Sequence, residues 1–183
     1  PDSGPAGTDP EGSPEDYLRP FEEVTKDLQK QTGLFTTYSD LESGDLYLAL
    51  LPEQLDRNFL MVASIESGIG EAGLFRGWPL NDLLVQFREG RNNRLEVVVP
   101  NTFIRNPDGQ DWQQRLLDSS FSDSTIFAIA VVSVDPDSQA KLIDLNDLIM
   151  QRDLANVSAA LSGAVDSYTR NEELSYIDQL QVF

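Results

Sequence analysis

Two absences in the composition limit the residues of this chain that could do chemistry. The 183 residues include no histidine and no cysteine. Without cysteine, disulfides, thiol catalysis and thiolate zinc ligands are excluded. Without histidine, the chain lacks the usual general base near neutral pH and the commonest metal ligand. Any catalytic mechanism would therefore have to work without imidazole.

One serine and one lysine have the spacing of a nucleophile and its base. Ser138 and Lys141 form a Ser-x-x-Lys sequence, and lysine is a base that can replace histidine. The motif requires both side chains on one helix face. Here the residues lie in a turn that runs into a predicted strand, where positions three apart point to opposite faces. We therefore interpret this pair as a chance match.

A glycine-rich segment, "SGIGEAGLFRGWP", superficially resembles a phosphate-binding loop. Such a loop needs a strand before it and a helix immediately after it. Pro79 and strand-like residues follow here instead. We therefore predict that residues 66–78 form a loop between two strands, and this position makes the loop a candidate lid or contact loop.

Clustered carboxylates are the remaining candidates for chemistry. Hard cations such as Ca²⁺ take several oxygen ligands from one loop, but none of these clusters has the spacing of an EF-hand loop. We interpret them as turn residues and solvated surface. The sequence therefore indicates no catalytic, cofactor-binding or metal-binding residue. The clusters are Asp40, Glu42 and Asp45, then Asp135 and Asp137, then Asp144 and Asp147.

The charge of the chain argues against nucleic-acid binding. Asp and Glu number 31 against 13 Lys and Arg, a formal net charge of -18. Such a surface repels phosphate backbones and anionic lipid. Arg88, Arg91 and Arg94 come closest to a basic patch, but they flank a predicted hairpin turn and are interleaved with Glu89 and Glu96. We expect no nucleic-acid partner.

The apolar runs are too short for a membrane span. The longest are Phe59 to Ala63 and Ile126 to Val132, whereas a transmembrane helix needs about 20 apolar residues.

Residues 1–16 are mostly Pro, Gly, Ser and acidic residues, which predicts a disordered linker. Residues 17–183 are enough for one α+β domain with a sizeable core.

The last segment, "SYIDQLQVF", finishes on apolar residues with no polar tail. We therefore expect the domain to be truncated at its C-terminal end. Contiguous apolar residues of this kind usually mark an interface, so we expect another polypeptide to cover them. They are Tyr176, Ile177, Leu180, Val182 and Phe183.

A helix is predicted from about Pro20 to Gly33. Tyr17, Phe21, Val24 and Leu28 recur at helical spacing. Proline fits the first turn of a helix, and Gly33 is a natural stop.

Strand signals fill the middle of the chain. Segments 33–40 and 45–51 meet at a turn-like "SDLESGD", and segments 80–89 and 94–99 meet at "GRNN", which predicts two antiparallel hairpins. The apolar run Phe59 to Ala63 predicts a central strand buried on both faces. A strand from Ser124 to Val134 should return after a turn at Pro136. Its predicted core residues are Ile126, Phe127, Ile129 and Val131.

Short helices are predicted between Asp108 and Asp123, over Asn146 to Gln151 and over Asn156 to Val165. The order of helix, many strands and short helices predicts an α+β fold. We expect a mainly antiparallel β-sheet, arranged as a sandwich or a partly open barrel, with an N-terminal helix and short C-terminal helices.

The order of several segments resembles the N-terminal, noncatalytic region of a family of bacterial zinc-dependent metalloproteases. The segments "GLFTTY", "LYLAL" and "RNFLMVASI" carry the resemblance most specifically, and "SYIDQLQVF" agrees in order and character. The resemblance covers about Pro20 to Phe183. In that family the region precedes a metzincin-like catalytic domain whose His-Glu-x-x-His helix supplies two zinc ligands and the general base. The members resemble exported proteins.

The resemblance implies a noncatalytic domain that packs against or positions the peptidase domain of an exported, periplasmic or extracellular, zinc-dependent metalloprotease. Since this chain has no histidine, no catalytic residue carries over, and zinc is expected only in the catalytic domain. The implied partner is that domain of the same protein, with a peptide or protein as a possible substrate. The residues also leave open a self-contained β-rich extracellular binding module.

Overall fold

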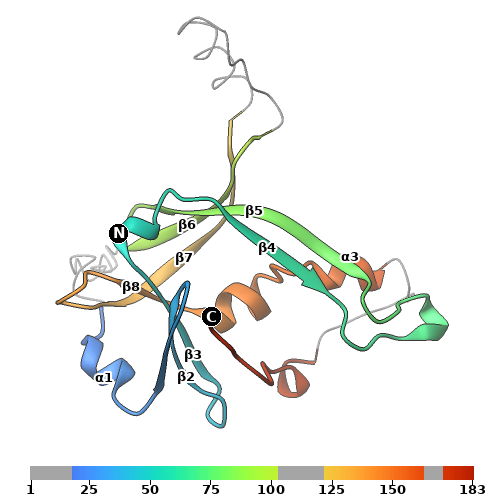
Figure 1. Ribbon diagram of the computed structural model, residues 1–183, viewed down its shortest axis with the longest axis horizontal. Coiled ribbons are helices and arrows are strands. Elements are labelled where there is room, and N and C mark those ends of the chain that lie inside the picture. The colour runs from blue at the N-terminus through green and yellow to red at the C-terminus, as the bar shows by residue number, and fades with distance from the viewer. Residues whose placement is uncertain (1–17, 103–121, 163–170) are drawn as a thin grey trace, which may run out of the picture.

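The computed structural model describes residues 18–102, 122–162 and 171–183. Their strands form one eight-stranded sheet in the order β1-β2-β3-β8-β7-β6-β5-β4, and every neighbouring pair is antiparallel. The sheet curls into a half-barrel with a few short helices (Figure 1). The predicted α+β class is confirmed, and of the two predicted arrangements the partly open barrel is the one that forms.

The elements are short except for two strands. The strands are β1 (Gln29–Thr32), β2 (Thr36–Asp40), β3 (Asp45–Leu50), β4 (Phe59–Ser64), β5 (Pro79–Glu89), β6 (Arg94–Val99), β7 (Ser124–Val134) and β8 (Lys141–Asp144). The helical segments are α1 (Phe21–Thr25), η2 (Pro52–Gln54), η3 (Gly70–Ala72), the π-helical η4 (Asp147–Gln151), α3 (Val157–Ser162) and η5 (Glu172–Leu174).

The predicted hairpins are confirmed. β2 pairs with β3 across a turn that runs from Asp40 to Asp45. β5 pairs with β6 across a turn in which Asn92 and Asn93 take the left-handed conformation, which asparagine tolerates better than most residues. β7 and β8 pair across the turn that contains Pro136. In each case the residues of the short turn between the two strands favour the pairing.

The predicted N-terminal helix is much shorter than expected. It ends at Thr25, and the residues predicted to continue it form β1, which pairs with β2 from Gln29↔Ser39 to Thr32↔Thr36. Leu28 still packs against the apolar side chains around α1. Backbone pairing with a neighbouring strand therefore overrides the helical spacing, because it satisfies the same peptide groups.

The prediction that Phe59 to Ala63 form a central strand buried on both faces is wrong. β4 is the last strand of the sheet, and its burial alternates, with Phe59 and Met61 packed against the core and Leu60 and Val62 exposed. A short apolar run does not distinguish a central strand from an edge strand, since that depends on which other strands pair with it.

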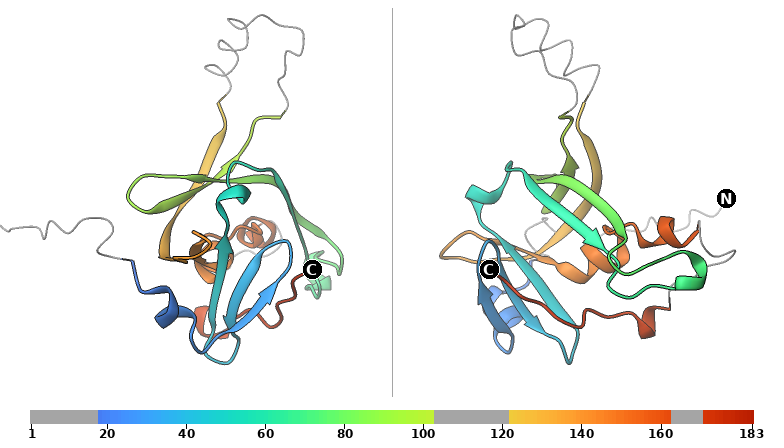
Figure 2. Two further views of the ribbon diagram at one scale, coloured as in Figure 1. Left: turned by 60° about the vertical axis from the view of Figure 1, so that its left-hand side comes forward. Right: turned by 45° about the vertical axis from the view of Figure 1, so that its right-hand side comes forward.

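The main core lies on the concave face of the sheet. Leu50, Leu95, Val97 and Ile143 have no exposed surface there. The helical segments η4 and α3 follow β8 and lie on this side (Figure 2), and Leu148 and Leu154 contribute to the core. The predicted helical segment at 146–151 is confirmed as η4, and α3 accounts for 157–162 of the predicted 156–165.

The convex face has a smaller core at one end of the sheet. Tyr47 and Ala49 of β3 and Leu142 of β8 pack there with Val24 of α1. The segment before α1 is fixed to β7, because the Arg19 N–H donates to the Val132 carbonyl and the Ser133 hydroxyl donates to the Arg19 carbonyl. α1 therefore covers the convex face over β2, β3, β8 and part of β7.

Two burial predictions need correction. In β7, Ile129 and Val131 are buried as predicted, whereas Ile126 and Phe127 pack against the main core but are only half-buried. In the last segment, Ile177 and Leu180 pack against the main core of this same chain. Val182 is half-buried, and Tyr176 and Phe183 are exposed.

Three sequence predictions lie wholly or largely outside the described residues. They are the disordered linker at 1–16, the helix between Asp108 and Asp123, and the end of the helix predicted at 156–165.

Thr37 generates a stability prediction. Its hydroxyl is buried and has no hydrogen-bond partner among the described residues. An unpaired buried hydroxyl costs about 1–3 kcal/mol, so we expect Thr37→Val to raise the free energy of unfolding by about 1 kcal/mol. Urea denaturation measures this. Thr36→Val, at a half-buried position on the opposite face, is the control and should change stability by less than about 0.5 kcal/mol. A less stable Thr37→Val protein would contradict the prediction.

Candidate interaction surface

The convex face of β4 is apolar and uncovered by any described element. Leu60 and Val62 are 71% and 65% exposed. Their partners on β5 are Leu84 and Asp82, and side chains of paired residues share a face of the sheet. We call these four residues the β4 face. The α1 helix, which covers the convex face elsewhere, lies at the opposite end of the sheet (Figure 2).

The outer edge of β4 has no strand partner in the described part of the chain. Its inner edge pairs with β5. The register shifts between Ala63 and Ser64, where β5 and not β4 has the extra residue. Beyond this shift the N–H of Ile65 donates to Trp78 and its carbonyl accepts from Gly77. Since peptide groups alternate in direction along a strand, the N–H and carbonyl groups of Leu60 and Val62 lie on the outer edge. The β4 face and this edge adjoin each other.

The predicted loop at 66–78 extends the apolar surface. Backbone hydrogen bonds organise it, including Leu74 N–H to the Ile69 carbonyl, and the Leu74 side chain is buried. Ile69, Phe75 and Trp78 are exposed large apolar residues. A hollow of about 420 Å³ beside them is lined by Glu66, Ser67, Gly68, Gly70, Leu74, Phe75 and Arg76. The loop therefore has the properties of a contact loop.

Glycine at position 68 is required by packing. A Cβ atom there would lie 2.3 Å from the Leu74 carbonyl oxygen, closer than any two such atoms approach. Gly68, one of the glycines that superficially suggested a phosphate cradle, thus allows the chain to fold back against Leu74. η3 has only three residues and supplies no helix N-terminus of the kind that binds phosphate.

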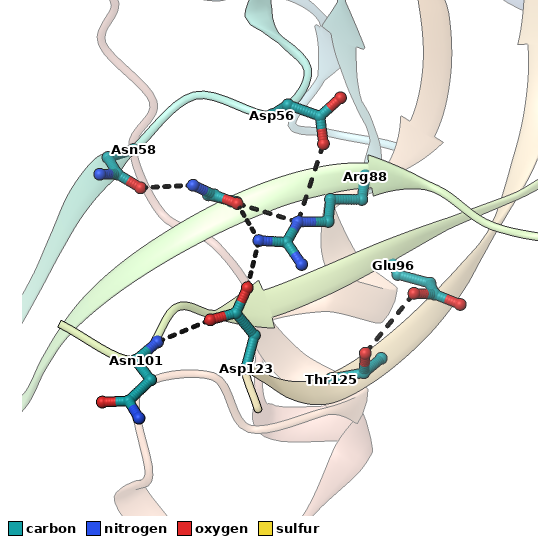
Figure 3. Close-up of polar contacts among 8 residues, drawn as sticks. Asp56, Asn58, Arg88, Glu96, Asn101, Asp123 and Thr125 are labelled. Atoms are coloured by element: carbon teal, nitrogen blue, oxygen red, sulfur yellow. Dashed lines mark hydrogen bonds and ion pairs between the residues drawn. The ribbon is translucent and has the colours of Figure 1, made fainter. Parts of the chain in front are cut away.

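A polar network borders the β4 face at its other end (Figure 3). The Arg88 guanidinium donates to the Gln86 side-chain oxygen and forms an ion pair with Asp123. The Gln86 amide donates to Asn58 at 2.7 Å. A weaker ion pair joins Arg88 to Asp56 at 3.7 Å. Arg88 is therefore already neutralised, and the three arginines at this hairpin do not act together as a basic patch.

Asp123 holds residue 101 near β5. The backbone N–H of Asn101 donates to the Asp123 carboxylate at 2.8 Å. This hydrogen bond, followed by the one from Arg88, keeps the pKa of Asp123 below its ordinary value of 3.8. The Asp123 carboxylate thus links Arg88 of β5 to the backbone of Asn101.

The structure does not bring Ser138 and Lys141 together as a catalytic pair. The Ser138 hydroxyl donates to Asp135 at 2.6 Å, and this bond is the main reason why the pKa of Asp135 lies below its ordinary value. Lys141 begins β8 and forms an ion pair with Glu89. The two side chains have different partners, as their positions in a turn and a strand predict.

The acidic clusters form turns. Asp40 accepts the Glu42 N–H, which is the main reason why its pKa lies below the ordinary value. Asp135 accepts the Asp137 N–H, and Asp144 accepts two N–H groups at the start of η4. Among the described residues, no three His, Cys, Asp or Glu side chains gather in a group that could hold a metal ion.

No helix in the described ranges is long and apolar enough to cross a membrane.

The sequence did not indicate the β4 face or Asp123. Alternation along β5 could have indicated that Gln86 and Arg88 lie opposite Val85 and Phe87. The pairing of Arg88 with Asp123 joins residues 35 positions apart, and no local pattern reports such a contact.

Asp123 generates a pH prediction. Because its pKa is lowered in the folded state, its ionised form stabilises that state above the ordinary value of 3.8, and this contribution is lost as pH falls through the lower, folded pKa. We expect the Asn101 amide resonance to titrate with a midpoint below 3.8. Amide NMR measures the midpoint. The inflection should vanish in Asp123→Asn and persist in Asp56→Asn, and an unchanged inflection in Asp123→Asn would refute the assignment.

Comparison of the chain with protein-family models, curated proteins and solved structures gives no significant match. The resemblance to zinc-dependent metalloproteases therefore stays a prediction.

Proposed function

We propose that this chain is a noncatalytic accessory domain of an exported zinc-dependent metalloprotease, and that it packs against and positions the peptidase domain. The binding role is supported by one observation above all. Leu60 and Val62 are exposed on a strand whose outer edge is unpaired in the described part of the chain. Contiguous exposed apolar surface usually marks a binding site.

The β4 face and the contact loop are adjacent along the chain and together form the candidate interface. Loop 65–78 connects β4 directly to β5, so Ile69, Phe75 and Trp78 follow the exposed residues of β4 along one hairpin. A specific interface generally buries at least about 1,000 Å² in total, and aromatic side chains such as Trp contribute disproportionately to its stability. This hairpin supplies both an apolar strip and aromatic residues.

The identity of the partner is supported by the sequence resemblance. The segments that carry it, "LYLAL" and "RNFLMVASI", correspond to β3 and to β4 with the turn before it. The chain has no histidine or cysteine, so the zinc ligands would belong to the peptidase domain. In this proposal the chain contributes a surface and the partner contributes the chemistry.

A self-contained extracellular binding module is the second candidate function. Ile177 and Leu180 pack against the main core of this chain instead of forming a surface for another polypeptide. In this case the β4 face would bind a separate ligand.

The proposed function predicts a complex with the polypeptide encoded directly after residue 183. That sequence should contain His-Glu-x-x-His. When it is coexpressed with residues 1–183 as a separate chain, sedimentation velocity should show a one-to-one complex with a dissociation constant of about 1 μM or lower. Zinc analysis should locate the metal in the partner. Absence of the motif, or of a complex, would favour the binding module.

Substitutions test which surface is used. Leu60→Lys and Val62→Lys introduce charges that the complex would have to bury, so each should weaken binding at least about tenfold. Leu41→Lys, at an exposed leucine in the β2–β3 turn, is the matched control and should bind like the wild type. Equal affinities for all three variants would exclude the β4 face from the interface.

A further inference from the structure

We propose that β4 binds an extended, basic segment of the partner polypeptide as an additional strand of the sheet. This inference rests on the proposed function and specifies how the partner is held. An added strand gains affinity from main-chain hydrogen bonds and specificity from alternate side chains.

The two edges of the sheet differ in how they are protected. β1 consists of Gln29, Lys30, Gln31 and Thr32, and next to it the Leu34 N–H donates to the Phe183 carbonyl. A polar edge with a lysine, continued by other chain segments, discourages pairing with another polypeptide. β4 reads Phe-Leu-Met-Val-Ala-Ser, without a charge or a proline, and pairs with no strand other than β5 among the described residues. Only the β4 edge is therefore suited to accept a strand.

The backbone of β4 presents the groups that strand addition requires. The alternation that follows from the Ile65 hydrogen bonds places the N–H and carbonyl groups of Leu60 and Val62 on the outer edge. A helix docked on the β4 face would leave these groups without protein partners. An extended segment would pair with them and also place alternate side chains beside Leu60 and Val62.

The charges around this edge favour a basic segment. Asp82 is exposed, lies on the β4 face and pairs with Val62. Glu66 and Glu71 are exposed on the adjoining loop, where Arg76 is the basic residue. The chain as a whole carries -18 charges, which attract a cationic segment at long range. The segment expected here has apolar residues at alternate positions and Lys or Arg at its ends.

A second copy of the chain fits this edge less well. In an antiparallel two-fold pairing of β4 with a second copy, each copy would bring a net charge of -18 to the contact. Two surfaces with a large charge of the same sign repel each other. We therefore assign the edge to a basic segment of a different polypeptide.

A synthetic peptide tests the mode of binding on the whole chain. The probe is acetyl-Lys-Thr-Val-Thr-Val-Thr-Val-Thr-Lys-amide, added to ¹⁵N-labelled residues 1–183. We expect amide exchange at Leu60 and Val62 to slow at least about tenfold at saturation, since these N–H groups become hydrogen-bonded. The amides of β1 are the internal control and should not change. If the peptide binds to saturation and exchange at Leu60 and Val62 is unchanged, the proposal is overturned. It is equally overturned if exchange at these amides does not change at any peptide concentration.

Two modified probes separate backbone pairing from charge. N-methylation of the central five residues removes their donors and should weaken binding at least about tenfold. Replacing both lysines with glutamate should weaken binding at low ionic strength and much less at high ionic strength, where the charges are screened. Equal affinity of the N-methylated probe would exclude strand addition.

Val62→Pro changes the protein side of the same contact. Proline lacks the outer-edge N–H and is tolerated on edge strands, so the variant should fold and lose peptide binding at least about tenfold. The N-methylated probe makes the same test without altering the protein, should this variant be unstable.

The outcomes distinguish this inference from the proposed function. A partner complex that Leu60→Lys weakens but Val62→Pro does not would retain the accessory domain and overturn strand addition. Peptide binding without any complex with the downstream polypeptide would retain strand addition and overturn the metalloprotease assignment. A homodimer of the free chain that Val62→Pro dissociates would overturn the choice of a basic partner.

Discussion

The pairing of β3 with β8 is the constraint on which the rest of the fold depends. It joins Tyr47–Leu50 to Lys141–Asp144, and so unites β1, β2 and β3 with β7, β6, β5 and β4 on the other side of β8. The four residues of β8 supply both faces, because Ile143 packs in the concave core and Leu142 in the convex one. Both are fully buried. A residue change that displaced β8 would therefore disturb both cores together.

This central pairing decides which segments are left at the edges. With β8 between β3 and β7, the sheet runs outward to β1 at one end and to β4 at the other. α1 covers the convex face near β3 and β8, fixed there by the contacts of Arg19 with β7. The helix does not reach β4, so the apolar residues of that strand stay exposed. The candidate surface thus follows from the order of strands.

The surroundings of β4 are ordered by polar contacts at one end and by backbone contacts at the other. Arg88, Gln86 and Asp123 form a network in which the main ionic groups are paired. The contact loop is closed by hydrogen bonds between Ile65 and the residues before β5. Order on both sides gives the exposed strand a defined conformation before any partner binds, and this reduces the entropy that binding would cost.

The composition by itself excluded chemistry that needs histidine or cysteine side chains of this chain. The sequence also determined the mainly antiparallel α+β class and the local hairpins, because turn residues and side-chain patterns act over a few positions. It also indicated that Ser138 lies in a turn and that Lys141 lies at the start of a strand. Only the tertiary structure decided that residues after Thr25 form a strand, that Phe59 to Ala63 form an edge, and that Arg88 meets Asp123. Each of these depends on which distant segment supplies a hydrogen-bonding partner, and that choice is made by the packing of the whole sheet around β8.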